Sequence, residues 1–176
     1  MKDYARLLVF MFLLYSFSSL SYVPARAQET MTKEEIGKPT GKVSPPAPDF
    51  ELDDIYQDTY ILSSYKNKQP VLLFFWTTWC PFCRRELAVL NDRYAVLQQD
   101  GIEVLSINVG ESPSKVQDFL KNYHLAYRVL LDKDTSVSHS YEVIGVPTYA
   151  LIDKAGYVVF HENFFPLKEY KELIEK

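Results

Sequence analysis

The chain has 176 residues and a formal net charge of −4, with 47% hydrophobic and 24% charged residues. These proportions exclude a wholly disordered chain, and the length suits one domain with short additions. The acidic balance, with no basic cluster longer than Arg84-Arg85, argues against nucleic acid as the main partner. The two cysteines, Cys80 and Cys83, are too few for a disulfide scaffold, a four-cysteine zinc site or an iron–sulfur cluster.

Residues 1–27 have the features of an export signal. Lys2 and Arg6 precede an uncharged stretch over residues 7–25, and Ala25-Arg26-Ala27 has the small-residue pattern of a cleavage site. We therefore expect a signal peptide over 1–27. The alternative is an uncleaved N-terminal anchor, because an uncharged stretch of this length is just long enough to span a bilayer. Both alternatives predict an exported protein, periplasmic or held at the extracytoplasmic face of the membrane.

The segment over residues 28–46 is expected to be a flexible tether. It is polar and ends in the proline-rich run Ser44-Pro45-Pro46, so it has little to bury. Residues 47–176 form the predicted domain. Two short alternating stretches, 49–52 and 59–62, open this domain on either side of polar residues, and they predict a β-hairpin.

Alternating strands and helices are expected next. The apolar run 71–76 is too short for an independent helix and predicts a central strand buried on both faces. A helix is expected over 81–98, followed by a second buried strand over 102–108 and a helix with Ser114 as its N-cap. The apolar residues of the first helix form one stripe at helical spacing: Cys83, Leu87, Leu90, Tyr94 and Leu97.

The C-terminal part of the sequence predicts a short strand over 129–131 and a short helix over 135–141. Two strands, 149–152 and 157–161, then flank a turn, and a helix over 167–175 closes the chain. This order predicts an α/β fold with a mixed central sheet flanked by helices on both faces. The N-terminal hairpin and a short inserted βα unit are its additions.

The two cysteines lie where the strand over 71–76 passes into the helix over 81–98. Pro81 suits the first helical position, because its missing N–H costs nothing there, and Cys80 is then the N-cap. At that position free backbone N–H groups and the positive end of the helix dipole favour a thiolate. Cys83, one turn further along, can close a small-loop disulfide with Cys80.

Two other interpretations of the cysteine pair are open. A structural disulfide closing so small a ring would remove little unfolded-state entropy, about 2 kcal/mol in the loop model. Half of a zinc site would need a second cysteine pair, and His124, His139 and His161 lack metal-ligand spacing. The pattern therefore favours a redox-active pair, and we expect neither a metal site nor a cofactor.

The pattern strand, Trp-Cys-x-x-Cys, helix, followed by Gly145-Val146-Pro147-Thr148, resembles the thioredoxin superfamily. Five features resemble its exported TlpA/ResA group of thiol–disulfide oxidoreductases. They are Ala47-Pro48-Asp49-Phe50, the Trp79–Cys83 run, Glu86, Asn108-Val109-Gly110-Glu111-Ser112 and Val146-Pro147-Thr148. The resemblance covers residues 47–176 and implies a thioredoxin-like fold.

The resemblance also implies a substrate-binding surface around the cysteines. It implies a cis peptide bond at Val146–Pro147, and X-Pro bonds are those at which the cis form is tolerated. The backbone before this proline pairs with the substrate chain in the family. The residues expected to bind substrate are Trp79, Pro81, Phe82, Val146 and Pro147.

Glu86 is a candidate third catalytic residue. Periodicity places it at the edge of the apolar stripe, one turn beyond Cys83, where it is either a solvated carboxylate or a partly buried acid that handles the proton of Cys83. Thioredoxin has an aspartate where this chain has Phe74, and relatives with a glutamate at position 86 use it for this role. Glu111 fits the family pattern, but solvation explains it equally well.

We expect an exported oxidoreductase that reduces substrate disulfides. An exposed Cys80 thiolate would attack the substrate, and Cys83 would resolve the mixed disulfide. The dipeptide Pro81-Phe82 adds no histidine charge to the thiolate, which favours a reductant over a strong oxidant. The resemblance implies exported substrates such as apocytochrome c and a membrane dithiol donor of the DsbD/CcdA type. We expect a monomer.

Two alternative functions remain. A peroxide-reducing redoxin would carry P-x-x-x-T-x-x-C around its nucleophile; Thr77 fits this pattern, but Leu73 occupies the proline position. A non-enzymatic chaperone or binding module would use only the groove at Val146–Pro147.

Overall fold

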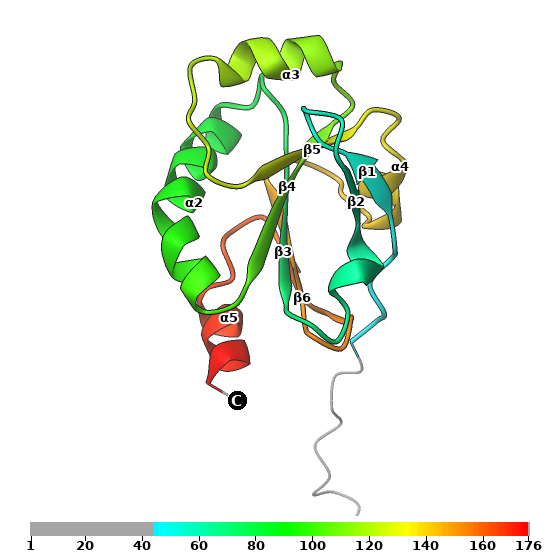
Figure 1. The fold of residues 1–176 in the computed structure, drawn as a ribbon, viewed down its shortest axis with the longest axis vertical. Coiled ribbons are helices and arrows are strands. Elements are labelled where there is room, and N and C mark those ends of the chain that lie inside the picture. Colours follow the sequence, from blue (N-terminus) through cyan, green and yellow to red (C-terminus); the bar gives the residue numbers. More distant parts are fainter. Residues whose placement is uncertain (1–43, 176) are drawn as a thin grey trace, which may run out of the picture. The chain divides into compact units, whose positions relative to one another are not determined.

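A computed structural model describes residues 44–175, so the expected leader over 1–27 and the tether as far as residue 43 lie outside the described residues. The domain is built on a five-stranded sheet, which Figure 1 shows between the helices. The order of its strands is β5-β4-β3-β6-β7. Its strands are β3 (Val71–Trp76), β4 (Glu103–Val109), β5 (Arg128–Asp132), β6 (Thr148–Ile152) and β7 (Val158–Glu162). Strands β3, β4 and β5 are parallel, whereas β6 runs antiparallel to both β3 and β7. The predicted mixed sheet is confirmed.

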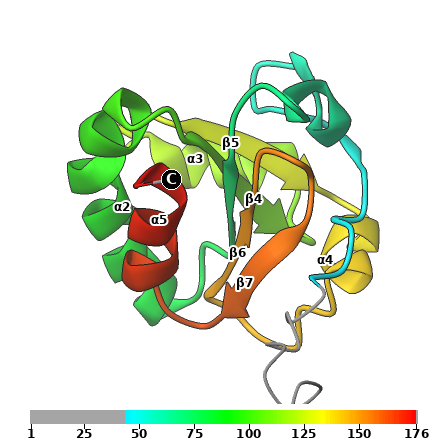
Figure 2. The ribbon, with the colours of Figure 1, turned by 90° about the horizontal axis from the view of Figure 1, so that it is seen from below.

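Helices cover both faces of this sheet, as expected. They are α2 (Pro81–Gln99), α3 (Pro113–Leu120), α4 (Ser136–Ser140) and α5 (Leu167–Ile174). Figure 2 shows α2 and α5 on one side of the sheet and α4 on the other. Strand β5 and helix α4 form the short βα unit that the sequence predicts. Over residues 44–175, no helix has both the length and the apolar character needed to cross a membrane.

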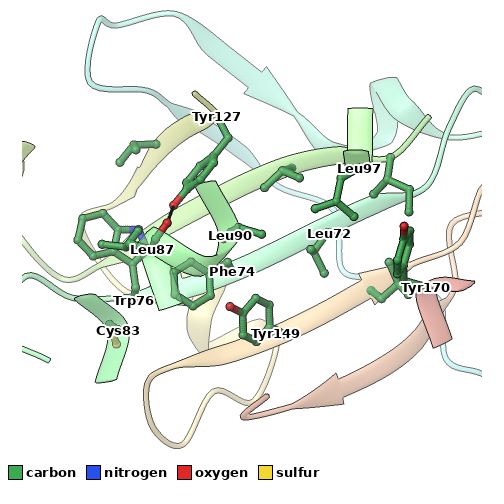
Figure 3. Packing of buried hydrophobic residues seen from close by; sticks show 14 of the residues in the cluster. Leu72, Phe74, Trp76, Cys83, Leu87, Leu90, Leu97, Tyr127, Tyr149 and Tyr170 are labelled. Carbon is green, nitrogen blue, oxygen red and sulfur yellow. Dashed lines mark hydrogen bonds between the residues drawn. The ribbon is translucent and has the colours of Figure 1, made fainter. Parts of the chain in front are cut away.

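Strand β3 is the centre of the core, and all 6 of its residues are buried. Because side chains alternate along a strand, Phe74 and Trp76 pack toward the α2 side, while Leu73 and Phe75 pack toward α4. The α2 stripe meets the first of these faces (Figure 3). Its fully buried members are Cys83, Leu87, Leu90 and Leu97, and Tyr94 is partly buried. The helix and its buried face are thus confirmed.

The N-terminal hairpin is present, with different ends from those expected. Strand β1 (Glu51–Asp53) pairs antiparallel with β2 (Thr59–Ile61). Leu62, expected at the end of the second strand, instead begins a 3₁₀ turn, η2 (Leu62–Tyr65), and its side chain is buried. Backbone pairing also starts before the predicted boundary at residue 47, because the Val158 N–H donates to the Pro45 carbonyl at 2.9 Å.

The start of α3 differs from the prediction by two residues. The N-cap is Ser112, whose side chain accepts a hydrogen bond from the Lys115 N–H at 3.4 Å. Ser114 was the expected N-cap, which is wrong because Pro113 occupies the first helical position. Proline is preorganised for that position, so the residue before it becomes the cap.

Candidate active site

The cysteine pair occupies the first turn of α2. Cys80 is the N-cap in an extended conformation, Pro81 follows at the first helical position, and Cys80 and Cys83 form a disulfide. The Cys83 N–H donates a hydrogen bond to the Cys80 sulfur at 3.0 Å. This is the placement that the motif predicts. On reduction, the same N–H group and the helix dipole favour a thiolate at Cys80.

The exposure of Cys80 differs from the expectation. Cys80 is 3% exposed and Cys83 is fully buried. Cys80 is therefore the more accessible of the two cysteines, but it is a buried residue and not an exposed one. The Val146 carbonyl oxygen lies 3.6 Å from the Cys80 sulfur. This contact joins the start of α2 to the segment before β6, which is far away in the sequence.

The segment before β6 contains the predicted cis peptide bond at Val146–Pro147. Both residues are half-buried. The Asn163 side-chain amide donates to the Pro147 carbonyl at 2.7 Å and to the Thr148 hydroxyl oxygen at 3.0 Å, and the Thr148 hydroxyl donates to the Gly145 carbonyl at 2.6 Å. The sequence does not single out Asn163, because the two groups to which it donates, on Pro147 and Thr148, lie about 15 positions earlier in the chain.

Large apolar side chains next to the cysteines in the sequence are exposed. Trp79 and Phe82 are 63% and 64% exposed, and Pro81 between the cysteines is also exposed. Ile144, which the sequence does not single out, is fully exposed two residues before Val146. Exposed apolar patches of this kind are typical of interaction sites. Substrate binding at Trp79, Pro81, Phe82 and Val146–Pro147 stays a prediction.

Glu86 is half-buried, and the buried Tyr149 of β6 holds its carboxylate. The Tyr149 hydroxyl donates to Glu86 Oε2 at 2.8 Å. Burial, together with this hydrogen bond, raises the pKa of Tyr149, so the phenol keeps its proton and remains a donor. The Tyr149 ring packs on Phe74 at 4.7 Å between centroids, with Cys83 on the same side of the sheet (Figure 3). Partial burial of Glu86 is confirmed, and its coupling to Cys83 stays a prediction.

Glu111 is buried beneath the loop that leads to Cys80, and solvation is the wrong interpretation of it. Its carboxylate accepts hydrogen bonds from the Thr78 N–H at 2.6 Å and the Thr78 hydroxyl at 2.7 Å. The carboxylate also accepts a hydrogen bond from the Asn108 side-chain NH₂ group at 2.9 Å and forms an ion pair with the Lys115 ammonium at 2.7 Å. The sequence places Glu111 directly after β4, and parallel neighbouring strands end at the same edge of a sheet, but this position alone does not distinguish a buried carboxylate from a solvated one.

The comparisons with known proteins agree with this geometry. The model of the AhpC/TSA family matches residues 43–161. The chain belongs to the AhpC/TSA family. It is 39% identical over 112 residues to the thiol–disulfide oxidoreductase ResA of Geobacillus kaustophilus, an alignment that spans 64% of this chain and 64% of that relative. It is 35% identical over 127 residues to ResA of Bacillus thuringiensis subsp. konkukian, spanning 72% of this chain and 69% of the relative.

A solved structure of an exposed thioredoxin is also similar to this chain. The exposed lipoprotein thioredoxin Etrx1 of Streptococcus pneumoniae superposes with a TM-score of 0.64 and 30% identity, over 72% of this chain and 100% of that one. The predicted resemblance to ResA-like members of the thioredoxin superfamily is confirmed, and so is the thioredoxin-like fold.

In this AhpC/TSA-family chain, the carboxyl group of Glu111 is held in its charged form. Burial alone would raise its pKa. The hydrogen bonds from Lys115, Thr78 and Asn108 outweigh burial and lower the pKa of Glu111 below its ordinary value. Glu111 therefore carries a negative charge at neutral pH.

Proposed function

We propose that the chain is an exported thiol–disulfide oxidoreductase that reduces disulfides of other exported proteins. The observation that carries the proposal is the Cys80–Cys83 disulfide at the first turn of α2, with the Val146 carbonyl 3.6 Å from the Cys80 sulfur. The ResA relatives are named thiol–disulfide oxidoreductases, which supports the class of reaction. Export rests on the leader-like residues 1–27, either as a cleaved signal peptide or as an anchor.

The chemistry follows from the two sulfurs. In the reduced protein the Cys80 thiolate attacks one sulfur of a substrate disulfide, and the substrate S–S bond breaks as its other sulfur leaves as a thiolate. The Cys83 thiol then loses its proton and attacks the Cys80 sulfur. The Cys80–Cys83 bond forms, and the second substrate sulfur leaves as a thiolate. Two electrons thus pass from the pair to the substrate.

The proposal also covers the direction of electron transfer and the partner proteins. Pro81-Phe82 adds no positive charge beside the Cys80 thiolate, and this supports a reductant, because strong oxidants depend on a strongly stabilised thiolate. Exported thiol proteins such as apocytochrome c are the proposed substrates. A membrane dithiol protein of the DsbD/CcdA type would return electrons to the oxidised pair.

Catalysed reduction of insulin by dithiothreitol tests the activity. The wild-type protein should accelerate the reaction, because the cysteine pair shuttles electrons to insulin, and Cys80→Ser should fall to the uncatalysed rate. A chaperone or binding module that uses only the Val146–Pro147 groove would give the uncatalysed rate with the wild-type protein too, and that result would contradict the proposal.

A peroxide-reducing redoxin is the second candidate, because the family model that matches is AhpC/TSA. Thr77 precedes Cys80 at the required spacing, but its hydroxyl is buried without a partner among the described residues, and the buried Leu73 of β3 occupies the proline position. Oxidation of the reduced pair by hydrogen peroxide and by insulin can be compared in the same preparation. Faster reaction with peroxide would favour this second candidate.

A further inference from the structure

Thr78, in the short loop between β3 and α2, forms hydrogen bonds through its N–H, its hydroxyl and its carbonyl group. Its N–H and its hydroxyl both donate to the Glu111 carboxylate, at 2.6 and 2.7 Å. Its carbonyl accepts a hydrogen bond from Nε of Arg84 at 3.0 Å. Trp79 and Cys80 follow Thr78 directly, so a displacement of Thr78 moves the residue that carries the redox-active sulfur.

The carboxylate that holds Thr78 is itself fixed from β4 and α3. The side chain of Glu111 is only 4% exposed and pairs with Lys115 at 2.7 Å. The amide of Asn108 turns its NH₂ group toward Glu111 at 2.9 Å, although its oxygen is then buried without a partner among residues 44–175. In this orientation Asn108 gives the carboxylate a further hydrogen-bond donor, beside Thr78 and Lys115.

We propose that Glu111 is a positioning residue for the redox pair: its carboxylate fixes Thr78 and thereby the place of Cys80 at the start of α2. The inference rests on the proposed oxidoreductase function. Glu111 contacts Thr78 and neither cysteine, so it acts through the loop. Its effect on chemistry comes from the Cys80 sulfur, which is stabilised as a thiolate only while it lies against the Cys83 N–H and the helix N-terminus.

Glu111→Gln should disturb the Thr78 loop without removing the cysteines. The glutamine keeps the shape but loses the charge and cannot accept all of the hydrogen bonds, so the Thr78 loop loosens. The pKa of the Cys80 thiol in the reduced protein should rise, because the thiolate loses part of its stabilisation. Alkylation of Cys80 by iodoacetamide at neutral pH and insulin reduction should both slow, by about tenfold, the size expected for losing a hydrogen bond to a charged group.

Asp132 supplies the matched control. It is fully buried at the end of β5, next to β4, and its carboxylate accepts the N–H groups of Val137 at 3.2 Å and Ser138 at 2.8 Å. Asp132→Asn therefore replaces another buried carboxylate group that accepts backbone hydrogen bonds, but at the start of α4 instead of α2. Both variants should lower the midpoint of thermal unfolding, and only Glu111→Gln should change the pH dependence of Cys80 alkylation.

A milder variant keeps the inference testable if Glu111→Gln does not fold. Thr78→Val removes one of the two hydrogen bonds that Thr78 donates to Glu111 and keeps the backbone one, so a smaller rise in the pKa of the Cys80 thiol is expected. An unchanged or lowered pKa in these variants would overturn the inference, because a carboxylate acting only as a nearby negative charge would lower the pKa on removal. Alkylation is measured without a protein substrate, so it is independent of the insulin assay: an inactive wild-type protein would reject the proposed function and leave this comparison intact.

Discussion

Cys83→Ser is expected to accumulate as mixed disulfides with substrate proteins, and Cys80→Ser is expected to form none. The reason is the position of the two sulfurs: Cys80 is the N-cap of α2 and the more accessible residue, whereas Cys83 is fully buried. In Cys83→Ser the first attack still occurs, but no second thiolate is present to release the substrate. Non-reducing electrophoresis of each reduced variant after incubation with a substrate protein that contains a disulfide would show the adducts.

The double variant with both cysteines replaced by serine is the control for noncovalent association, since it should give no adduct that dithiothreitol removes. Adducts formed through Cys83 in Cys80→Ser, with none in Cys83→Ser, would reverse the assignment of nucleophile and resolving cysteine.

Glu86→Gln is expected to change the titration of the cysteine pair and to lower insulin reduction about a hundredfold, as for loss of a general acid or base. Glu86 lies one turn beyond Cys83 on α2, so removing its negative charge should make thiolate formation easier and lower the apparent pKa values of the pair. Thiolate formation can be followed by ultraviolet absorbance against pH. Curves and rates that overlay those of the wild-type protein would mean that Glu86 has no part in the chemistry.

Tyr149→Phe extends this test to the partner of Glu86. The variant removes the hydroxyl that donates to Glu86 Oε2 at 2.8 Å and keeps the ring packed on Phe74. It should shift the same titration by less than Glu86→Gln does, and the shift should vanish when Glu86 is already glutamine. Tyr127→Phe is the matched control, because it removes a buried hydroxyl bonded to the Leu87 carbonyl at 2.9 Å and leaves the Glu86 carboxylate untouched.

Local sequence signals account for most of the fold and for the centre of the site. Pro81 at the first helical position predicts Cys80 as the N-cap, and the spacing of Leu87, Leu90 and Leu97 predicts the buried face of α2. The apolar run of β3 predicts a strand buried on both faces. These features depend on residues a few positions apart, so periodicity and capping rules are enough to find them.

The polar contacts of the site could not be predicted in the same way. Tyr149 reaches Glu86 across 63 sequence positions, and Glu111 reaches Thr78 across 33. The partners of these residues depend on which strands are neighbours in the sheet. A single sequence does not show whether a polar residue that follows a strand is solvated or buried. The burial of Cys80 depends likewise on a distant segment, the one that contains Val146.

The reduction potential of the Cys80–Cys83 pair tests the central claim most directly. It can be measured by equilibrating the protein with glutathione buffers of known ratio and quantifying the fraction of the pair that is oxidised. The proposed reductant should have a potential more negative than about −200 mV, on the reducing side of the range spanned by thioredoxin-fold proteins. A value near −120 mV, typical of a strong oxidant such as DsbA, would contradict the account.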